Sequence, residues 1–282
     1  MNEQKAPAGI EWTRVRNPDG TVRRGFTWNV MTGCLHDCEW TIDGQWTECY
    51  AKTLAERMGR GYPQGFASYY FHPDRLYLPL KQKEPAGIFP DSQSDMFGHW
   101  VLSDHRDDLE LALEVIRIAD WHIFQPLTKN TRAYRRVENL PRNLWLGISS
   151  PPDHFMGKDL NDTQKEAFLR VALETLSLKA AEGYVTWMSF EPLSRDWAHV
   201  VAEYPGALKW AVVGAASLGK RYYAPVESHV RNLLDVLDSQ NIPTFFKGNM
   251  RSLAWARDNW REAFPVTQPL AATPDPTSAT ER

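Results

Sequence analysis

Short apolar runs recur along the chain and alternate with amphipathic stretches. Several runs are apolar almost throughout, which is typical of strands that are covered on both faces in a parallel sheet. Seven runs are therefore predicted strands: Thr27–Thr32, Gly87–Pro90, His122–Leu127, Leu144–Ser149, Val185–Phe190, Trp210–Ala215 and Thr244–Phe246.

The stretches between these runs predict helices. Apolar positions at helical spacing indicate one helix over Asp104–Asp120, with Ser103 as its N-cap, and another over Asp162–Glu182, ended by Gly183. A third is predicted over Val226–Gln240. Alternating strands and helices predict an α/β fold with right-handed crossovers and a parallel sheet. Six or seven such units favour a (β/α) barrel, a partial TIM barrel, over a flat doubly wound sheet. No Gly-rich dinucleotide fingerprint follows the first run, which lowers the Rossmann alternative.

The length of 282 residues suits one large domain, which we place at residues 10–266. The polar residues 1–9 and the Pro-, Thr- and Ala-rich residues 267–282 are predicted to be disordered. A net charge of -3 argues against nonspecific duplex binding as the main task. The sequence shows neither a secretory signal nor a bilayer-spanning apolar run, so we expect a cytoplasmic protein without membrane association.

Polar residues follow the predicted strands at the end where a barrel carries its chemistry. One such residue per strand is explained by simple capping, whereas a full ring predicts a pocket. The ring comprises Cys34, Cys38, Ser94, Asp95, Thr128, Lys129, Ser149, Ser150, Glu191, Ser217 and Lys247.

All three cysteines lie in the segment Gly33–Lys52. In a reducing compartment such a cluster indicates a metal site better than a disulfide framework. Thiolates of Cys34, Cys38 and Cys49 can hold three irons of a [4Fe–4S] cubane and leave the fourth iron open. In radical enzymes that iron chelates S-adenosylmethionine. The alternative is zinc with His36 as fourth ligand, but this spacing lacks the usual two-pair pattern, so we favour iron–sulfur.

Several phrases together resemble one known family. The two main motifs are FTWNVMTGCLHDC, which ends at Cys38, and CYAK, which starts at Cys49. Five shorter motifs elsewhere in the chain add to them: IEWT, SQSDMFG, LTK, LWLG and SFEPL. The chain resembles the phage Gp37/Gp68-like family, a DUF5131-type domain of unknown function and a radical-SAM-like group. The resemblance implies a barrel with a three-cysteine cluster and S-adenosylmethionine at the strand ends. It supplies no substrate.

Two features depart from the expected patterns. Radical enzymes usually space their cysteines as C-x3-C-x2-C, whereas here the ten residues Glu39–Glu48 separate the last two. Loop extension costs little closure entropy, so the cluster could still form. The family often has Gly-Gly-Glu-Ser where this chain has Gly214–Ser217, so Ala216 lacks a carboxylate.

Five residues are candidates for cofactor binding. Tyr50 directly follows the last cysteine and could pack beside the cofactor, although it could also be a core aromatic. Ser94 and Asp95 could contact the methionine amine or the ribose, the alternative being an N-cap. Glu191 could accept bonds from ribose hydroxyls, because a charge directly after an apolar strand is costly unless it has a partner. Ser217 belongs to the same predicted pocket.

Lys129 and Lys247 are the catalytic candidates. Either ammonium could neutralise a carboxylate or phosphate of the cofactor or substrate. The structural alternative is an ion pair with Glu191 or Asp95.

The favoured function is a radical S-adenosylmethionine enzyme that receives electrons from a reductant such as flavodoxin or ferredoxin. Two arginine patches suggest a nucleic acid or nucleoside substrate, although a solvated face is the default for each: Arg14, Arg16, Arg23 and Arg24, and then Arg132, Arg135 and Arg136. One alternative is a non-catalytic cluster- or zinc-containing barrel that binds nucleic acid or a protein partner. Another is a zinc protein with a hydrolytic or structural role.

Overall fold

The fold is built on parallel strands that follow one another in chain order. The computed structural model describes residues 1–5, 9–42, 44–57, 59–218 and 221–266. The parallel strands are β2 (Arg24–Trp28), β7 (Ala86–Pro90), β8 (Ile123–Phe124), β9 (Leu127–Thr128), β10 (Trp145–Ser149), β13 (Val185–Phe190), β14 (Trp210–Val213) and β17 (Thr244–Phe246). Each predicted strand run overlaps at least one of them.

The segment Ile123–Thr128 joins two sheets into one succession. Its first part, β8, pairs with β7, and its second part, β9, pairs with β10, all in parallel. The order is therefore β2, β7, β8/β9, β10, β13, β14 and β17, with seven parallel positions. This topology agrees with the predicted parallel sheet.

The succession of strands curls around Trp12, which lies in the 3₁₀ turn η1 (Glu11–Thr13). The Trp12 ring lies 4.8 Å from Phe89 of β7 and 6.3 Å from Trp210 of β14. In a flat sheet those two strands would be about 19 Å apart, four spacings away, and one ring could not contact both. The curvature agrees with the barrel expectation. Among the described residues no pairing joins β17 to β2, and the complete barrel stays a prediction.

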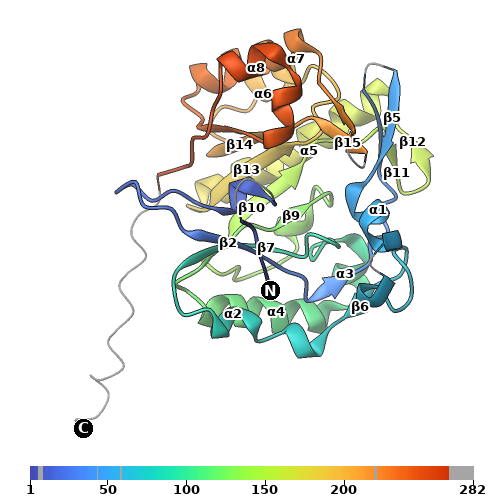
Figure 1. The fold of residues 1–282 in the computed structure, drawn as a ribbon, viewed down its shortest axis with the longest axis vertical. Coiled ribbons are helices and arrows are strands. Elements are labelled where there is room, and N and C mark those ends of the chain that lie inside the picture. Colours follow the sequence, from blue (N-terminus) through green and yellow to red (C-terminus); the bar gives the residue numbers. More distant parts are fainter. Residues whose placement is uncertain (6–8, 43, 58, 219–220, 267–282) are drawn as a thin grey trace.

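Helices lie around the curled sheet, most of them on its outer surface and the first one beside the short strands (Figure 1). They are α1 (Tyr50–Arg57), α2 (Leu78–Lys81), α3 (His99–Asp104), α4 (Arg106–Ile118), α5 (Asp162–Ala181), α6 (Ala198–Ala202), α7 (Glu227–Ser239) and α8 (Ala254–Asp258). Helix α5 begins with a capping box between Asn161 and Gln164, and Gly183 follows its end at φ 89°. Helix α7 buries Val230, Leu233, Leu234 and Leu237, the face that the sequence predicts.

Short strands gather beside the carboxyl ends of the parallel strands. They are β3 (Met31–Thr32), β4 (Glu39–Ile42), β5 (Gln45–Glu48), β6 (Tyr70–Phe71), β11 (His154–Phe155), β12 (Lys158–Asp159), β15 (Ala216–Leu218) and β16 (Arg221–Tyr223). β5, β11, β12 and α1 are visible together at one side of the molecule in Figure 1.

Two local expectations need correction. Asn2–Glu3 form strand β1, which pairs antiparallel with β2, so this part of residues 1–9 is ordered by sheet hydrogen bonds. Ser103 lies inside α3 and donates to the backbone oxygen of His99, so it does not cap the next helix. Helix α4 starts later than predicted, at Arg106. The predicted disorder of residues 267–282 lies outside the described residues.

In the part of the chain that the structure describes, no helix has both the length and the apolar character needed to cross a membrane.

Candidate functional site

The three cysteines line one cavity of about 80 Å³ at the carboxyl ends of the strands. Cys38 is buried, and Cys34 and Cys49 are half-buried. Between Cys38 and Cys49, strands β4 and β5 pair in antiparallel fashion as a hairpin, in which Glu39 is opposite Glu48. Cys38 and Cys49 directly flank the open end of this hairpin and lie opposite each other. The Cys49 N–H donates to the Cys38 carbonyl at 3.1 Å. The long gap folds upon itself and keeps the two cysteines adjacent.

The hairpin is fixed to the segment after β10. His154 of β11 pairs with Glu39 of β4, and the Thr41 N–H donates to Asp153 Oδ2 at 2.7 Å. The side chain of Trp40 is buried beneath the hairpin. These contacts make the insertion part of the wall of the cavity.

Asp95 holds the cysteine loop to the sheet. Its Oδ2 accepts from His36 Nε2 and Thr128 Oγ1, each at 2.8 Å, and from the Lys129 N–H at 2.9 Å. Its Oδ1 accepts from the Phe97 N–H at 3.0 Å. Burial alone would raise the pKa of Asp95, but the bonds from His36, Lys129 and Thr128 outweigh it and hold the pKa below its usual range. His36 lies between two cysteines in sequence, so this buried pair positions the thiols.

Ser94 positions the start of the same loop. Its hydroxyl donates to the Gly33 carbonyl at 2.5 Å. Gly33 has φ 84°, and a Cβ there would lie 1.8 Å from the Ser68 carbonyl oxygen, so only glycine fits directly before Cys34. Ser94 and Asp95, predicted to contact a cofactor, thus have protein partners that shape the cysteine cavity. Cofactor contact by either residue stays a prediction.

A second cavity, of about 240 Å³, adjoins the first, and both are lined by Cys49, Tyr50 and Lys129. The larger of the two contains the remaining predicted residues, Glu191, Ser217 and Lys247. We call the cavity with three cysteines the inner cavity and its neighbour the outer cavity. Ten of the eleven residues of the predicted polar ring therefore line these two adjoining cavities, and Ser150 lines neither.

Glu191 and Lys247 form an ion pair in the outer cavity. Burial lowers the pKa of Lys247, but the Glu191 carboxylate has the stronger combined effect and the pKa is raised overall. The structural alternative considered for these two residues is therefore present. Gly214 makes room for the pair, because a Cβ there would lie 2.9 Å from Glu191 Cγ.

Lys129 differs from Lys247 in its surroundings. Its ammonium lies 5.2 Å from the centre of the Trp40 ring, and within the described residues it pairs with no carboxylate. Only its backbone N–H contacts Asp95. Tyr50, which begins α1, donates its hydroxyl to the Ser92 carbonyl at 2.6 Å and keeps 47% of its surface exposed, so it is no core aromatic.

Burial favours the protonated form of two of the thiols, those of Cys34 and Cys38, in the metal-free chain. Burial raises the pKa of Cys38 to about 12, although the nearby Lys129 charge opposes the rise. Burial, followed by the neighbouring Cys38 and Cys49, raises the pKa of Cys34. Metal binding would have to release these protons.

One metal ion such as zinc needs all its sulfur donors about 2.3 Å from one point. Among the residues that the structure describes, no three His, Cys, Asp or Glu side chains form a group that could hold a metal ion. A cubane takes one thiolate per iron, so its ligands are spread more widely.

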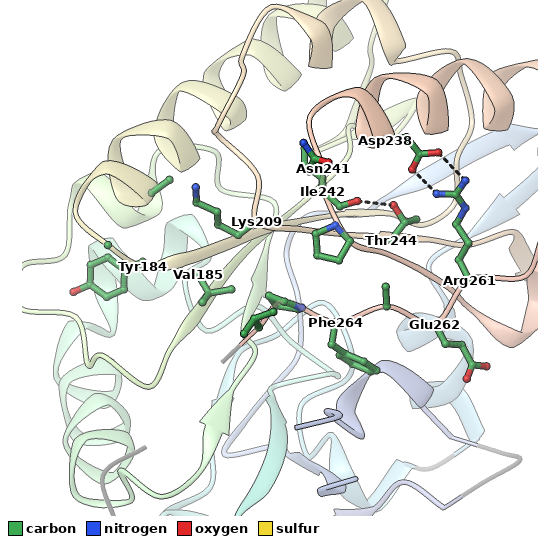
Figure 2. Close-up of a pocket in the computed structure, with 16 residues that line it drawn as sticks. Tyr184, Val185, Lys209, Asp238, Asn241, Ile242, Thr244, Arg261, Glu262 and Phe264 are labelled. Carbon is green, nitrogen blue, oxygen red and sulfur yellow. Dashed lines mark hydrogen bonds and ion pairs between the residues drawn. The ribbon is translucent and has the colours of Figure 1, made fainter. Parts of the chain in front are cut away.

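A larger cavity, of about 890 Å³, lies elsewhere, at the amino ends of β13, β14 and β17. Figure 2 shows Lys209 and Phe264 in its walls and Asp238 paired with Arg261. None of the predicted site residues lines it.

Residues 8–262 match the profile of a family described as a protein of unknown function (DUF5131). The chain belongs to the DUF5131 family. This result agrees with the family resemblance in the sequence and gives no activity. No curated protein matches the chain.

Sequence reasoning missed several residues of the DUF5131 site. Trp12, Trp40 and Ser189 line the outer cavity, and each has a buried polar atom without a hydrogen-bond partner in the described structure. The hairpin had a readable signal, since Asp43–Gly44 separates two short stretches rich in tryptophan and threonine. The sequence carries no comparable signal for Trp12 and Ser189, because only the curvature of the sheet brings these distant residues to the same cavity.

Proposed function

We propose that this chain is a radical S-adenosylmethionine enzyme. In the proposal, Cys34, Cys38 and Cys49 hold a [4Fe–4S] cluster in the inner cavity, and S-adenosylmethionine extends into the outer one. The observation that carries the proposal is the hairpin β4–β5, which places Cys38 and Cys49 side by side and leaves all three thiols on one cavity. A gap of ten residues is thereby compatible with a shared cluster.

The residues of the chain fit such ligands. The Lys129 ammonium supplies positive charge beside three thiolates, and the outer cavity has further polar groups in Glu191 and Ser189. Buried polar atoms without partners, as on Ser189, are costly unless a ligand meets them. Glu48 lines the same cavity as Ala216 and supplies a carboxylate where the family pattern is lost.

When bound and reduced by a flavodoxin or ferredoxin, the cluster and S-adenosylmethionine would supply a 5′-deoxyadenosyl radical that abstracts a hydrogen atom. The protein's part is positioning and exclusion of water. Asp95 and His36 fix the cysteine loop, and Trp40 covers the cavity from the hairpin. In the proposal, the Glu191 carboxylate, which pairs with Lys247, accepts hydrogen bonds from the hydroxyl groups of a ribose.

The test is reductive cleavage of S-adenosylmethionine. Protein reconstituted anaerobically with iron and sulfide is mixed with S-adenosylmethionine and dithionite, and 5′-deoxyadenosine is measured by mass spectrometry. We expect product from the wild type and from Lys209→Ala, a control at the opposite cavity, and none from Cys34→Ala. An intact cluster without any 5′-deoxyadenosine would contradict the enzyme. Salt-dependent nucleic-acid binding by that inactive protein would then favour a non-catalytic binding role.

A further inference from the structure

A separate cavity of about 570 Å³ opens on the outer side of the cysteine loop. It lies between helix α5 and the 3₁₀ turn η4 (Ala133–Arg135). Phe155 forms the boundary between the two sites, because its ring stacks on His36 with centroids 4.9 Å apart and also lines this cavity. We call it the arginine groove.

Two guanidinium groups face this groove without a carboxylate partner. Arg132 and Arg136 flank η4, line the groove and are exposed, and within the described residues neither forms an ion pair. Arg135, from the same turn, does not line the groove and pairs with Glu174 of α5 at 3.3 Å. Of the three arginines in this segment, the two that line the groove are therefore the two without a carboxylate partner among the described residues.

The turn that carries these arginines is rigidly anchored. Tyr134 is fully buried and donates its hydroxyl to the Gly147 carbonyl at 2.8 Å. The Asn130 N–H donates to Thr128 Oγ1 at 2.9 Å, and Asn130 Nδ2 donates to the Phe97 carbonyl at 3.0 Å. A fixed backbone leaves less to order when a ligand binds, which favours a binding site over a solvated patch.

The opposite wall of the groove is aromatic. Phe155 and Phe168 meet edge to face with ring centroids 5.6 Å apart, and both line the groove. Guanidinium groups match phosphate oxygens in a bidentate way, and exposed aromatic rings stack on nucleobases. The volume falls within the range of pockets for small organic ligands, about 300–1,000 Å³.

We propose that the arginine groove binds a nucleotide, with its phosphate on Arg132 and Arg136 and its base against Phe155 and Phe168. The nucleotide is either free or part of a single strand, since both carry the same chemistry. The proposal goes beyond the radical chemistry and needs no cluster, because the cysteines do not line this groove.

The test measures binding of a fluorescein-labelled single-stranded RNA of about ten nucleotides by fluorescence anisotropy. We expect Arg132→Ala/Arg136→Ala to weaken binding about tenfold or more and, since both arginines contact one phosphate, to reduce the slope of log affinity against log salt by about 0.7. Phe168→Leu should weaken binding with an unchanged salt slope. Arg135→Ala, the matched control, should bind like the wild type.

Competition identifies the source of the ligand. Displacement of the RNA by AMP assigns a free nucleotide, and displacement by an unlabelled strand alone assigns a single strand. Absence of binding at low salt would overturn the proposal, as would equal weakening by Arg135→Ala or equal displacement by polyglutamate. The Cys34→Ala/Cys49→Ala variant should still bind RNA, so this result and the fate of the radical chemistry are read separately.

Discussion

The two ends of the parallel strands carry cavities of different kinds. The cavity at the amino ends is the larger, about 890 Å³, and its ion pair between Asp238 and Arg261 is largely in solvent, with 49% and 34% of the side chains exposed. The cavities at the carboxyl ends are smaller, but Asp95 and His36 keep only 5% and 2% exposed. The volume of a cavity therefore does not identify the candidate site. The feature that distinguishes it is the presence of buried polar side chains that have hydrogen-bond partners.

The largest predicted effect is on Asp95. Asp95→Asn removes the buried negative charge that accepts three hydrogen bonds, one from His36 in the cysteine loop and two from Thr128 and Lys129 at the end of β9. We therefore expect the free energy of unfolding to fall by about 3–5 kcal/mol. Asp238→Asn, at the other end, should cost at most about 1 kcal/mol. Urea unfolding of the metal-free proteins compares the two, and equal losses would show that burial of Asp95 is of no consequence.

The same carboxylate predicts an acid dependence. The pKa of Asp95 is lower in the folded chain than in the unfolded chain, so its contribution is complete above the unfolded value and is lost as the pH falls through the folded value. The stability of the wild type should therefore decline more steeply than that of Asp95→Asn as the pH falls below about 4. Parallel curves of unfolding free energy against pH would exclude the effect.

The ion pair of the outer cavity gives an intermediate effect. Glu191→Gln removes the partner of Lys247, whose ammonium then has a weaker acceptor in a half-buried place, with 19% of its side chain exposed. We expect a loss of about 1–3 kcal/mol by thermal or urea unfolding. An equal loss of unfolding free energy in Asp238→Asn would contradict the expected difference between the ion pairs at the two ends of the strands.

Asp91 gives the smallest loss of stability. Its Oδ1 accepts the Met31 N–H at 2.7 Å, and burial raises its pKa well above the usual value. A raised pKa means that its contribution is complete below the unfolded value and is lost as the pH rises toward the folded value. Asp91→Asn keeps the acceptor, so we expect stability within about 1 kcal/mol of the wild type near pH 4 and an advantage for the variant at higher pH. Unfolding curves across this pH range that show a constant deficit would contradict the assignment.

The strands and helices were predictable because their apolar residues are consecutive or periodic. The three-cysteine loop was also predictable as a cluster, and Glu191 was correctly expected to need a partner. The hairpin in the ten-residue gap was not predicted, although Asp43–Gly44 is a hairpin signal. The protein partners of Asp95 and Ser94, which are His36 and the Gly33 carbonyl, could not be predicted, because strand position alone does not show which distant segments lie beside them. Contacts between distant segments decide such roles.

The most direct test of the central claim is the content of iron, sulfide and zinc in anaerobically purified and reconstituted protein. The account predicts about four irons and four sulfides per chain in the wild type, and loss of both in Cys34→Ala/Cys38→Ala/Cys49→Ala. One zinc per chain without sulfide would contradict it, and so would iron and sulfide retained by the triple variant.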